Sequence, residues 1–105
     1  MTAYEFVAAW KREKEQMLRL FMGDEGQSAV AAHVRSMTLS DEQLCQLRLA
    51  FDGALTDVMY TILLALEGEG SIGGIQQIYQ LTAQDGTVVT GGIEEEAWRQ
   101  FHGAS

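Results

Sequence analysis

The longest continuous pattern in this sequence is helical and runs from Ser40 to Gly68. Ser40 is the expected N-cap, because Gln43 stands three residues later and completes a capping box. Apolar residues then recur at spacings of three and four, at Leu44, Leu47, Phe51, Leu55, Val58, Ile62 and Leu66. From Val58 onward the pattern is apolar on nearly every side, which predicts a long, central and buried helix.

Two further helices are predicted before this one. The first is expected over residues 3–22, with Thr2 and Glu5 as its capping box and Gly23 at its end. The second is shorter and is expected over residues 25–37, opened by the acidic residue that precedes it.

The last third of the sequence changes from helical to extended patterns. A glycine-rich loop is followed by a predicted strand over residues 75–82, a turn at Asp85-Gly86 and a second strand over residues 87–90. A last short helix is expected over residues 93–102, and it would pack Ile93, Ala97, Trp98 and Phe101. The sequence therefore predicts an α+β fold that is mainly helical, with three N-terminal helices, one long and central, then a β-hairpin and a short C-terminal helix.

Length and charge limit the classes of function. With 105 residues and 11.6 kDa, the chain has room for a single domain, which we expect to span residues 1–105. The formal net charge is −8 at pH 7, and residues 56–105 hold seven acidic residues against Arg99 as their single basic one. Binding to nucleic acid or to an anionic membrane needs a cationic surface, so we expect neither partner.

Cysteine usage and the N-terminal residues bear on the compartment. Cys45 is the single cysteine, so no disulfide forms within the chain and a reducing compartment is expected. The first residues lack the positive charge and long apolar run of a signal peptide, and the longest apolar run, residues 58–66, is too short to span a bilayer. We therefore expect a soluble, cytoplasmic protein.

No catalytic or ligand-binding motif stands out among the reactive side chains. Residues 68–73 have the letters G-x-G-x-x-G, but a predicted helix precedes them and a strand follows, which is the reverse of a dinucleotide-binding loop. His33 and His102 lack a second ligand at metal-binding spacing, and the acidic neighbours of Cys45 disfavour a thiolate. We expect no cofactor, no metal and no catalysis. A small enzyme is the alternative, and it requires these three side chains to converge in one pocket.

The candidate binding surface is acidic. Three consecutive glutamates at residues 94–96 form the densest charge run, and in the first turn of a helix they would also stabilise that helix. With the other acidic residues near the predicted hairpin they would form a patch that steers a basic partner, beside one amphipathic tyrosine ring. The predicted partner-binding residues are Glu67, Glu69, Asp85, Glu94, Glu95, Glu96 and Tyr79.

One stretch of the C-terminal half resembles a known group of proteins. It runs from Leu63 to Gln77 (LLALEGEGSIGGIQQ), continues through Tyr79 to Gly91, and ends with the letters EEEAW at residues 94–98. It resembles small bacterial cytoplasmic proteins, among them immunity proteins of polymorphic-toxin and contact-dependent inhibition systems. These residues form no motif with an established chemical role, so no binding residue carries over. The resemblance implies an immunity protein that blocks a cognate toxin by direct binding, and an acidic chain suits a basic toxin.

A homo-oligomer is a further alternative. Its interface would be the exposed part of the first helix, with Tyr4, Trp10 and several methionines. The leading hypothesis is thus a non-catalytic module that binds a protein partner, such as a basic toxin domain. A small homo-oligomeric protein and a small enzyme are the alternatives.

Overall fold

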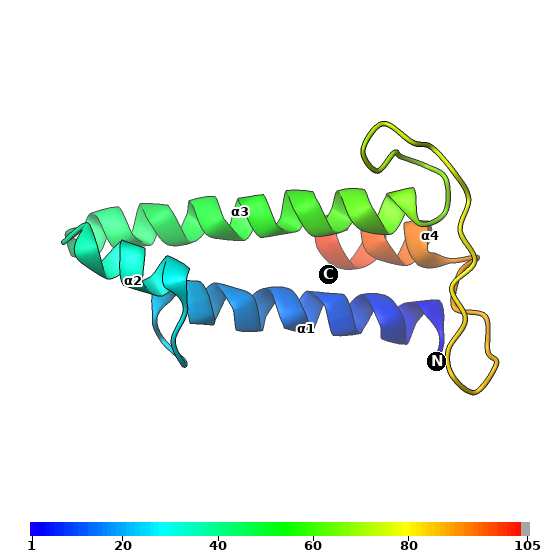
Figure 1. Cartoon of the computed structure of the whole chain (residues 1–105), viewed down its shortest axis with the longest axis horizontal. Helices are drawn as coiled ribbons and strands as arrows, with labels where there is room; N and C mark the ends of the chain where they lie inside the picture. The colour runs from blue at the N-terminus through cyan, green and yellow to red at the C-terminus, as the bar shows by residue number, and fades with distance from the viewer. Residues whose placement is uncertain (104–105) are drawn as a thin grey trace.

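Two long helices lie side by side and antiparallel along the long axis of the molecule (Figure 1). In the computed structural model, which describes residues 1–103, α1 spans Ala3–Met22 and α3 spans Asp41–Ala65. The short α2, Ala29–Ser36, packs on α1 where the chain crosses from one long helix to the other. At the opposite end, α4 (Ile93–Ala97) and the π-helix η1 (Trp98–His102) pack against both α1 and α3.

The caps of the two long helices form as the sequence predicts. Thr2 accepts a hydrogen bond from the Glu5 amide at 3.1 Å, and the Glu5 carboxylate accepts one from the Thr2 amide at 3.0 Å. Gly23 ends α1 in the left-handed conformation, with φ of 82°, which a glycine adopts without strain. Ser40 and Gln43 make the same reciprocal pair at the start of α3. The predicted bounds of α1 are confirmed, whereas α3 ends at Ala65, earlier than predicted.

The prediction for the second helix is wrong at its start. The helix begins at Ala29 with Ser28 as N-cap, whose hydroxyl accepts a hydrogen bond from the Ala31 amide at 3.0 Å. The preceding residues form a turn in which Gly26 has φ of 69°. Ser28 is therefore the N-cap, in place of Asp24, the acidic residue expected there. A helix that began earlier would include Gly26 in its left-handed conformation.

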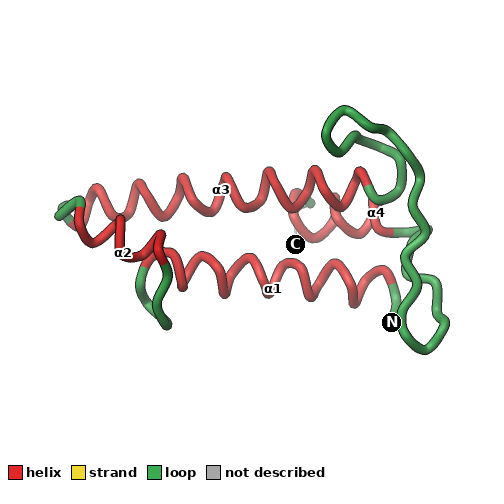
Figure 2. Tube along the Cα trace, viewed as in Figure 1, coloured by secondary structure: helices red, strands yellow, loops and turns green. Residues whose placement is uncertain are grey.

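The predicted α+β class is wrong, because residues 1–103 contain no β-strand (Figure 2). Residues 66–92 instead form a long irregular segment at one end of the helices, which we call the C-terminal loop. Its extended parts touch one another in three isolated bridges, Glu67 with Ile78, Ile72 with Ile75, and Thr82 with Val88. The described fold is therefore helical, and residues 104 and 105 of the predicted domain lie outside it.

The predicted hairpin does not form because its first strand makes backbone hydrogen bonds to two different segments, the end of α3 and the predicted second strand. The chain does reverse after residue 83, where the Gly86 amide donates to the Ala83 carbonyl at 2.9 Å. Two further backbone hydrogen bonds join the two sides of that turn, from Ala83 to Thr87 and from Val89 to Leu81, and only the second joins the two predicted strands. Upstream, the Tyr79 amide donates to the Leu66 carbonyl at 3.1 Å, so this part follows the exit of α3 instead. A two-stranded ladder this short does not persist without further strands.

The core lies where α1, α3, α4 and the C-terminal loop meet. Its buried members are contributed by all four segments: Val7, Leu63, Val89, Ile93 and Ala97. Half-buried apolar side chains surround them, including Phe6 and Trp10, whose rings meet edge to face at a centroid distance of 6.0 Å. Because Val89 belongs to this core, the loop is held at its C-terminal end by apolar packing.

The prediction that α3 is buried on all faces after Val58 is wrong. Met59, Leu63 and Ala65 are buried, but Val58 is 57% exposed. Among the helices of residues 1–103, only α1 and the α4–η1 pair pack along this helix, so the side facing away from them stays open to solvent.

Nowhere in residues 1–103 does a helix combine the length and the apolar character that crossing a membrane requires.

Truncating the core should destabilise the whole fold. Leu63 is fully buried, so Leu63→Ala should lower the free energy of unfolding by about 2–5 kcal/mol through lost burial and the cavity left behind. Leu49 lies on the same helix and is 61% exposed, so Leu49→Ala should change it by less than about 0.5 kcal/mol. Urea denaturation followed by circular dichroism measures both, and equal losses in the two variants would contradict this core.

Candidate functional site

The carboxylate of Glu67 closes the connection between the end of α3 and the start of α4. Its Oε2 accepts hydrogen bonds from the amides of Gly91, Gly92 at 3.1 Å and Ile93 at 3.0 Å, and its Oε1 accepts one from the Glu94 amide at 2.9 Å. Gly92, the N-cap of α4, supplies no side chain for this purpose. Glu67 therefore caps α4 from a distance of some twenty-five residues along the chain and fixes where Glu94 stands.

The four amides shift the ionisation of Glu67. Partial burial by itself raises the pKa of this carboxyl group, but the backbone hydrogen bonds from Glu94, Gly91, Ile93 and Gly92 outweigh it and lower the pKa below its ordinary value of 4.5. Glu67 was predicted as a partner-binding residue. Both of its oxygens are committed within the chain, so it positions the site instead of presenting a free charge.

The first hollow of the candidate site lies between the C-terminal loop and the start of α4. It has a volume of about 440 Å³, and four predicted residues line it: Glu67, Glu69, Tyr79 and Glu94. The apolar side chains of Ile78 and Val88 share this wall.

Gly68 brings Ile78 close to the exit of α3. It has φ of 84°, and a Cβ atom there would stand 2.6 Å from Ile78 Cγ1. A glycine is thus required both by the left-handed turn and by the close approach of the loop.

The second hollow opens beside the first, with Glu94 lining both. It has a volume of about 520 Å³ and is lined by Tyr60 of α3, Glu94 and Glu95 of α4, and Trp98 of η1. The two hollows together contain five of the seven predicted binding residues: Glu67, Glu69, Tyr79, Glu94 and Glu95. We call this surface the acidic–aromatic face.

Arg99 neutralises part of the glutamate run. It forms ion pairs with Glu95, at 3.0 Å, and with Glu96 one turn away on the same helical segment. The Glu96 side chain is 15% exposed and also accepts a hydrogen bond from Gln100, whereas that of Glu95 is 78% exposed. The structure therefore places Glu96 outside the candidate site, in a structural network.

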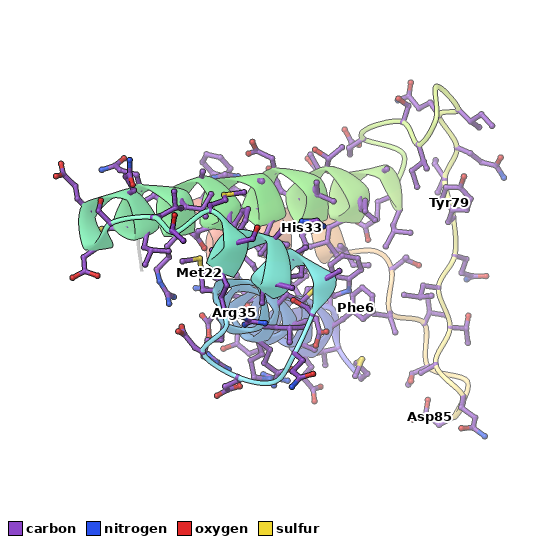
Figure 3. All side chains as sticks on the ribbon, turned by 60° about the vertical axis from the view of Figure 1, so that its left-hand side comes forward. Phe6, Met22, His33, Arg35, Tyr79 and Asp85 are labelled. Atoms are coloured by element: carbon purple, nitrogen blue, oxygen red, sulfur yellow. The ribbon has the colours of Figure 1, made fainter. Side chains whose placement is uncertain are left out.

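Asp85 also lies outside the two hollows. Its carboxylate accepts hydrogen bonds from the amide and hydroxyl of Thr87, which lower its pKa and close the turn of the loop. Figure 3 shows Asp85 at the tip of the C-terminal loop, well away from Tyr79.

The sequence interpretation missed three aromatic residues of this face. Trp98 was expected to pack in the core, but it is 58% exposed. His102 lies next to the second hollow, and its ring contacts Tyr60 and Trp98 in tilted arrangements, at centroid distances of 4.5 Å and 5.6 Å. The spacing held a signal for Trp98: Ile93, Ala97 and Phe101 repeat every four residues along one stripe, and Trp98 stands beside that stripe.

The three residues of the enzyme alternative lie on three different helices. His33 is on α2, Cys45 on the first turns of α3 and His102 on η1, and all three are exposed. No hydrogen bond joins them within residues 1–103. In Figure 3, His33 lies among the helices and away from the loop that carries Tyr79. The described residues also hold no cluster of three or more histidine, cysteine or carboxylate side chains suited to a metal ion.

Comparison with protein-family models, with curated proteins and with solved structures found no match to this chain.

Removing the charge of Glu67 should weaken the fold in a pH-dependent way. Glu67→Gln should lower the free energy of unfolding at pH 7 by about 1–3 kcal/mol. The backbone amides that donate to the charged carboxylate would then face the neutral side-chain amide of glutamine. The folded pKa is lowered, so the stabilisation by Glu67 is full above pH 4.5 and is lost as the pH falls through the folded value. The variant should therefore lose less stability than the parent on acidification.

Urea titrations at pH 7 and at successively lower pH measure this difference. Glu69→Gln is the matched control, since that exposed carboxylate accepts no hydrogen bond within the described residues. A loss of stability in Glu67→Gln that is the same at every pH would contradict the role of its charge.

Proposed function

We propose that this chain is a non-catalytic protein-binding module and that the acidic–aromatic face receives a basic protein partner. In the form implied by the sequence resemblance, it acts in the cytoplasm as an immunity protein that neutralises a toxin by direct binding. The observation that carries the proposal is the gathering of five predicted binding residues around two hollows that share Glu94.

Unpaired charge on this face supports a basic partner. Neither Glu69 nor Glu94 has a carboxylate engaged in an ion pair or side-chain hydrogen bond within residues 1–103. The surrounding C-terminal half carries seven acidic residues and one basic residue from residue 56 onward. Such a one-sided field accelerates the encounter with a cationic protein and discriminates against anionic ones.

Exposed apolar side chains next to the charges support a protein partner in particular. Ile78 is 78% exposed, Ile75 61% and Val88 50%, all on the C-terminal loop. The accessible surface of the chain is 6885 Å², compared with roughly 5,800 Å² for a typical folded monomer of this mass. The excess of roughly 1,100 Å² is larger than one side of a standard interface, about 800 Å², and the elongated shape of the molecule, 47 × 29 × 28 Å, contributes to it.

A homo-oligomer is the second candidate, and one surface favours it. A mostly apolar groove of about 430 Å³ runs along α1 and α3 and is lined by Met1, Phe6, Ala9, Trp10, Glu13 and Met59. It includes Trp10, which we expected at such an interface, and Tyr4 on the same helix is 59% exposed. Light scattering decides this alternative, because a mass of one chain rules it out.

The main proposal is tested by capture of the tagged protein from its native cells, with washes at low and high salt. We expect one stoichiometric basic protein that is released at high salt. With that partner purified, the double variant Glu69→Gln, Glu94→Gln should lower the association rate at low salt by about ten-fold. The rate should be unchanged at high salt, where screening removes the steering.

A matched control has the same change of charge elsewhere. Glu15→Gln, Glu42→Gln removes two exposed carboxylates, one on α1 and one near the start of α3, both outside the acidic–aromatic face. If both double variants slow association equally, net charge is responsible and the proposed face is wrong. Capture of no partner from cells that express toxin systems would overturn the immunity proposal.

A further inference from the structure

The second hollow combines aromatic rings with carboxylates in one lining. Tyr60 comes from α3 and Trp98 from η1, so the two rings are contributed by separate elements that pack together. Glu94 and Glu95 supply the acidic side of the same hollow. Aromatic faces carry negative electrostatic potential, so rings and carboxylates both favour a cation here and both disfavour an anion.

The rings are held in place before any ligand arrives. The His102 ring contacts Tyr60 and Trp98 in tilted arrangements, with interplanar angles of 39° and 36°. η1 itself closes through a hydrogen bond from the Gly103 amide to the Trp98 carbonyl at 2.7 Å, which spans five residues as a π-turn does. A preorganised pair of rings loses little side-chain freedom when it binds.

The chemistry of the hollow favours a guanidinium group over other cations. A guanidinium is planar, so it can lie on the Trp98 indole while its N–H groups point at Glu94 and Glu95. The same segment already shows this pairing internally, because the Arg99 guanidinium binds Glu95 and Glu96. The Glu95 side chain remains 78% exposed while it does so, and Glu94 has no ion-pair partner within the described residues.

We propose that the hollow of Tyr60, Trp98, Glu94 and Glu95 is an arginine site, which receives the guanidinium group of an arginine side chain presented by the partner. The identity of the ligand as part of a protein rests on the proposed function, whereas the binding of a guanidinium does not. An arginine buried against a tryptophan is a common source of binding energy in protein interfaces.

The direct test is a titration with Nα-acetyl-arginine N-methylamide, a capped arginine that mimics the residue within a chain. The chain has two tryptophans, so the indole N–H signal of Trp98 reports the site in a ¹⁵N correlation spectrum and that of Trp10 is the internal reference. We expect a saturable shift of the Trp98 signal and no shift for Trp10. The capped citrulline, which has the same shape without charge, should cause no saturable shift, and a capped lysine should bind more weakly.

Two arms of this titration separate a protein ligand from a free metabolite. Free arginine carries an α-carboxylate and an α-ammonium group in addition to the guanidinium, so its net charge equals that of the capped form. Within residues 1–103 the hollow has no basic lining residue that could pair with the carboxylate, so free arginine should bind no more tightly than the capped form. Tighter binding of free arginine would overturn the assignment to a protein side chain. A saturable shift with citrulline equal to that with arginine, or no shift with either, would overturn the guanidinium site itself.

Variants locate the site. Trp98→Ala should weaken binding of capped arginine at least about five-fold, read by calorimetry because the reporter is lost. Tyr4→Ala is its matched control, since Tyr4 is 59% exposed and lies outside the hollow. Glu94→Gln should weaken binding in the same direction, and Glu15→Gln should not. Glu94→Gln also carries the test if Trp98→Ala fails to fold, which a thermal melt establishes.

The captured partner separates this inference from the proposed function. Loss of partner binding in both Trp98→Ala and Glu94→Gln, with normal binding in both controls, supports the arginine site as part of the interface. A partner whose affinity is unchanged in these two variants overturns the arginine site and leaves the binding function standing. If capped arginine binds but no protein partner is captured, the guanidinium site is supported. The proposal that its ligand is a protein side chain is then overturned.

Discussion

Four backbone amides at the start of α4 converge on one carboxylate, that of Glu67, and the C-terminal part of the molecule depends on this arrangement. α4 is too short to be stable alone, and its N-cap glycine has no side chain with which to satisfy those amides. Glu67 meets this need from the end of α3, so it joins the long helix to the short one. Ile93 and Ala97 then enter the core, and Glu94, Glu95 and Trp98 are held on the surface.

The C-terminal loop follows from the same constraint. Its two ends are held close together, one by Glu67 at the exit of α3 and the other by Val89 in the core. Between them the backbone makes isolated bridges instead of a ladder, so the β-branched side chains of this segment stay exposed. In a larger sheet these side chains would pack against a neighbour. Here they surround an acidic hollow, which is why the loop is the surface most suited to a protein partner.

Part of the candidate site was predictable from the sequence and part was not. The acidic composition of residues 67–96 indicated a patch, and five of its seven predicted members do lie around the two hollows. Composition does not distinguish a free carboxylate from one that already accepts hydrogen bonds within the chain. Glu67, Glu96 and Asp85 each accept hydrogen bonds within the chain. The partners of Glu67 lie more than twenty residues away along the chain, whereas those of Glu96 and Asp85 lie within about one helical turn. The tilted contact between Tyr60 and His102 joins α3 to η1 across a long stretch of chain, so no local sequence pattern contains it.

The sequence by itself determined the starts of α1 and α3 and the end of α1, because a capping box and a terminal glycine act within one turn of the chain. It also determined the extent of the last helical segment, residues 93–102, through the stripe of Ile93, Ala97 and Phe101. Only the tertiary structure decided that residues 75–90 form no hairpin and that α3 keeps an open face. A strand pairs, and a helix face is buried, only where another segment packs against it. Which segment does so depends on contacts between residues far apart in the chain.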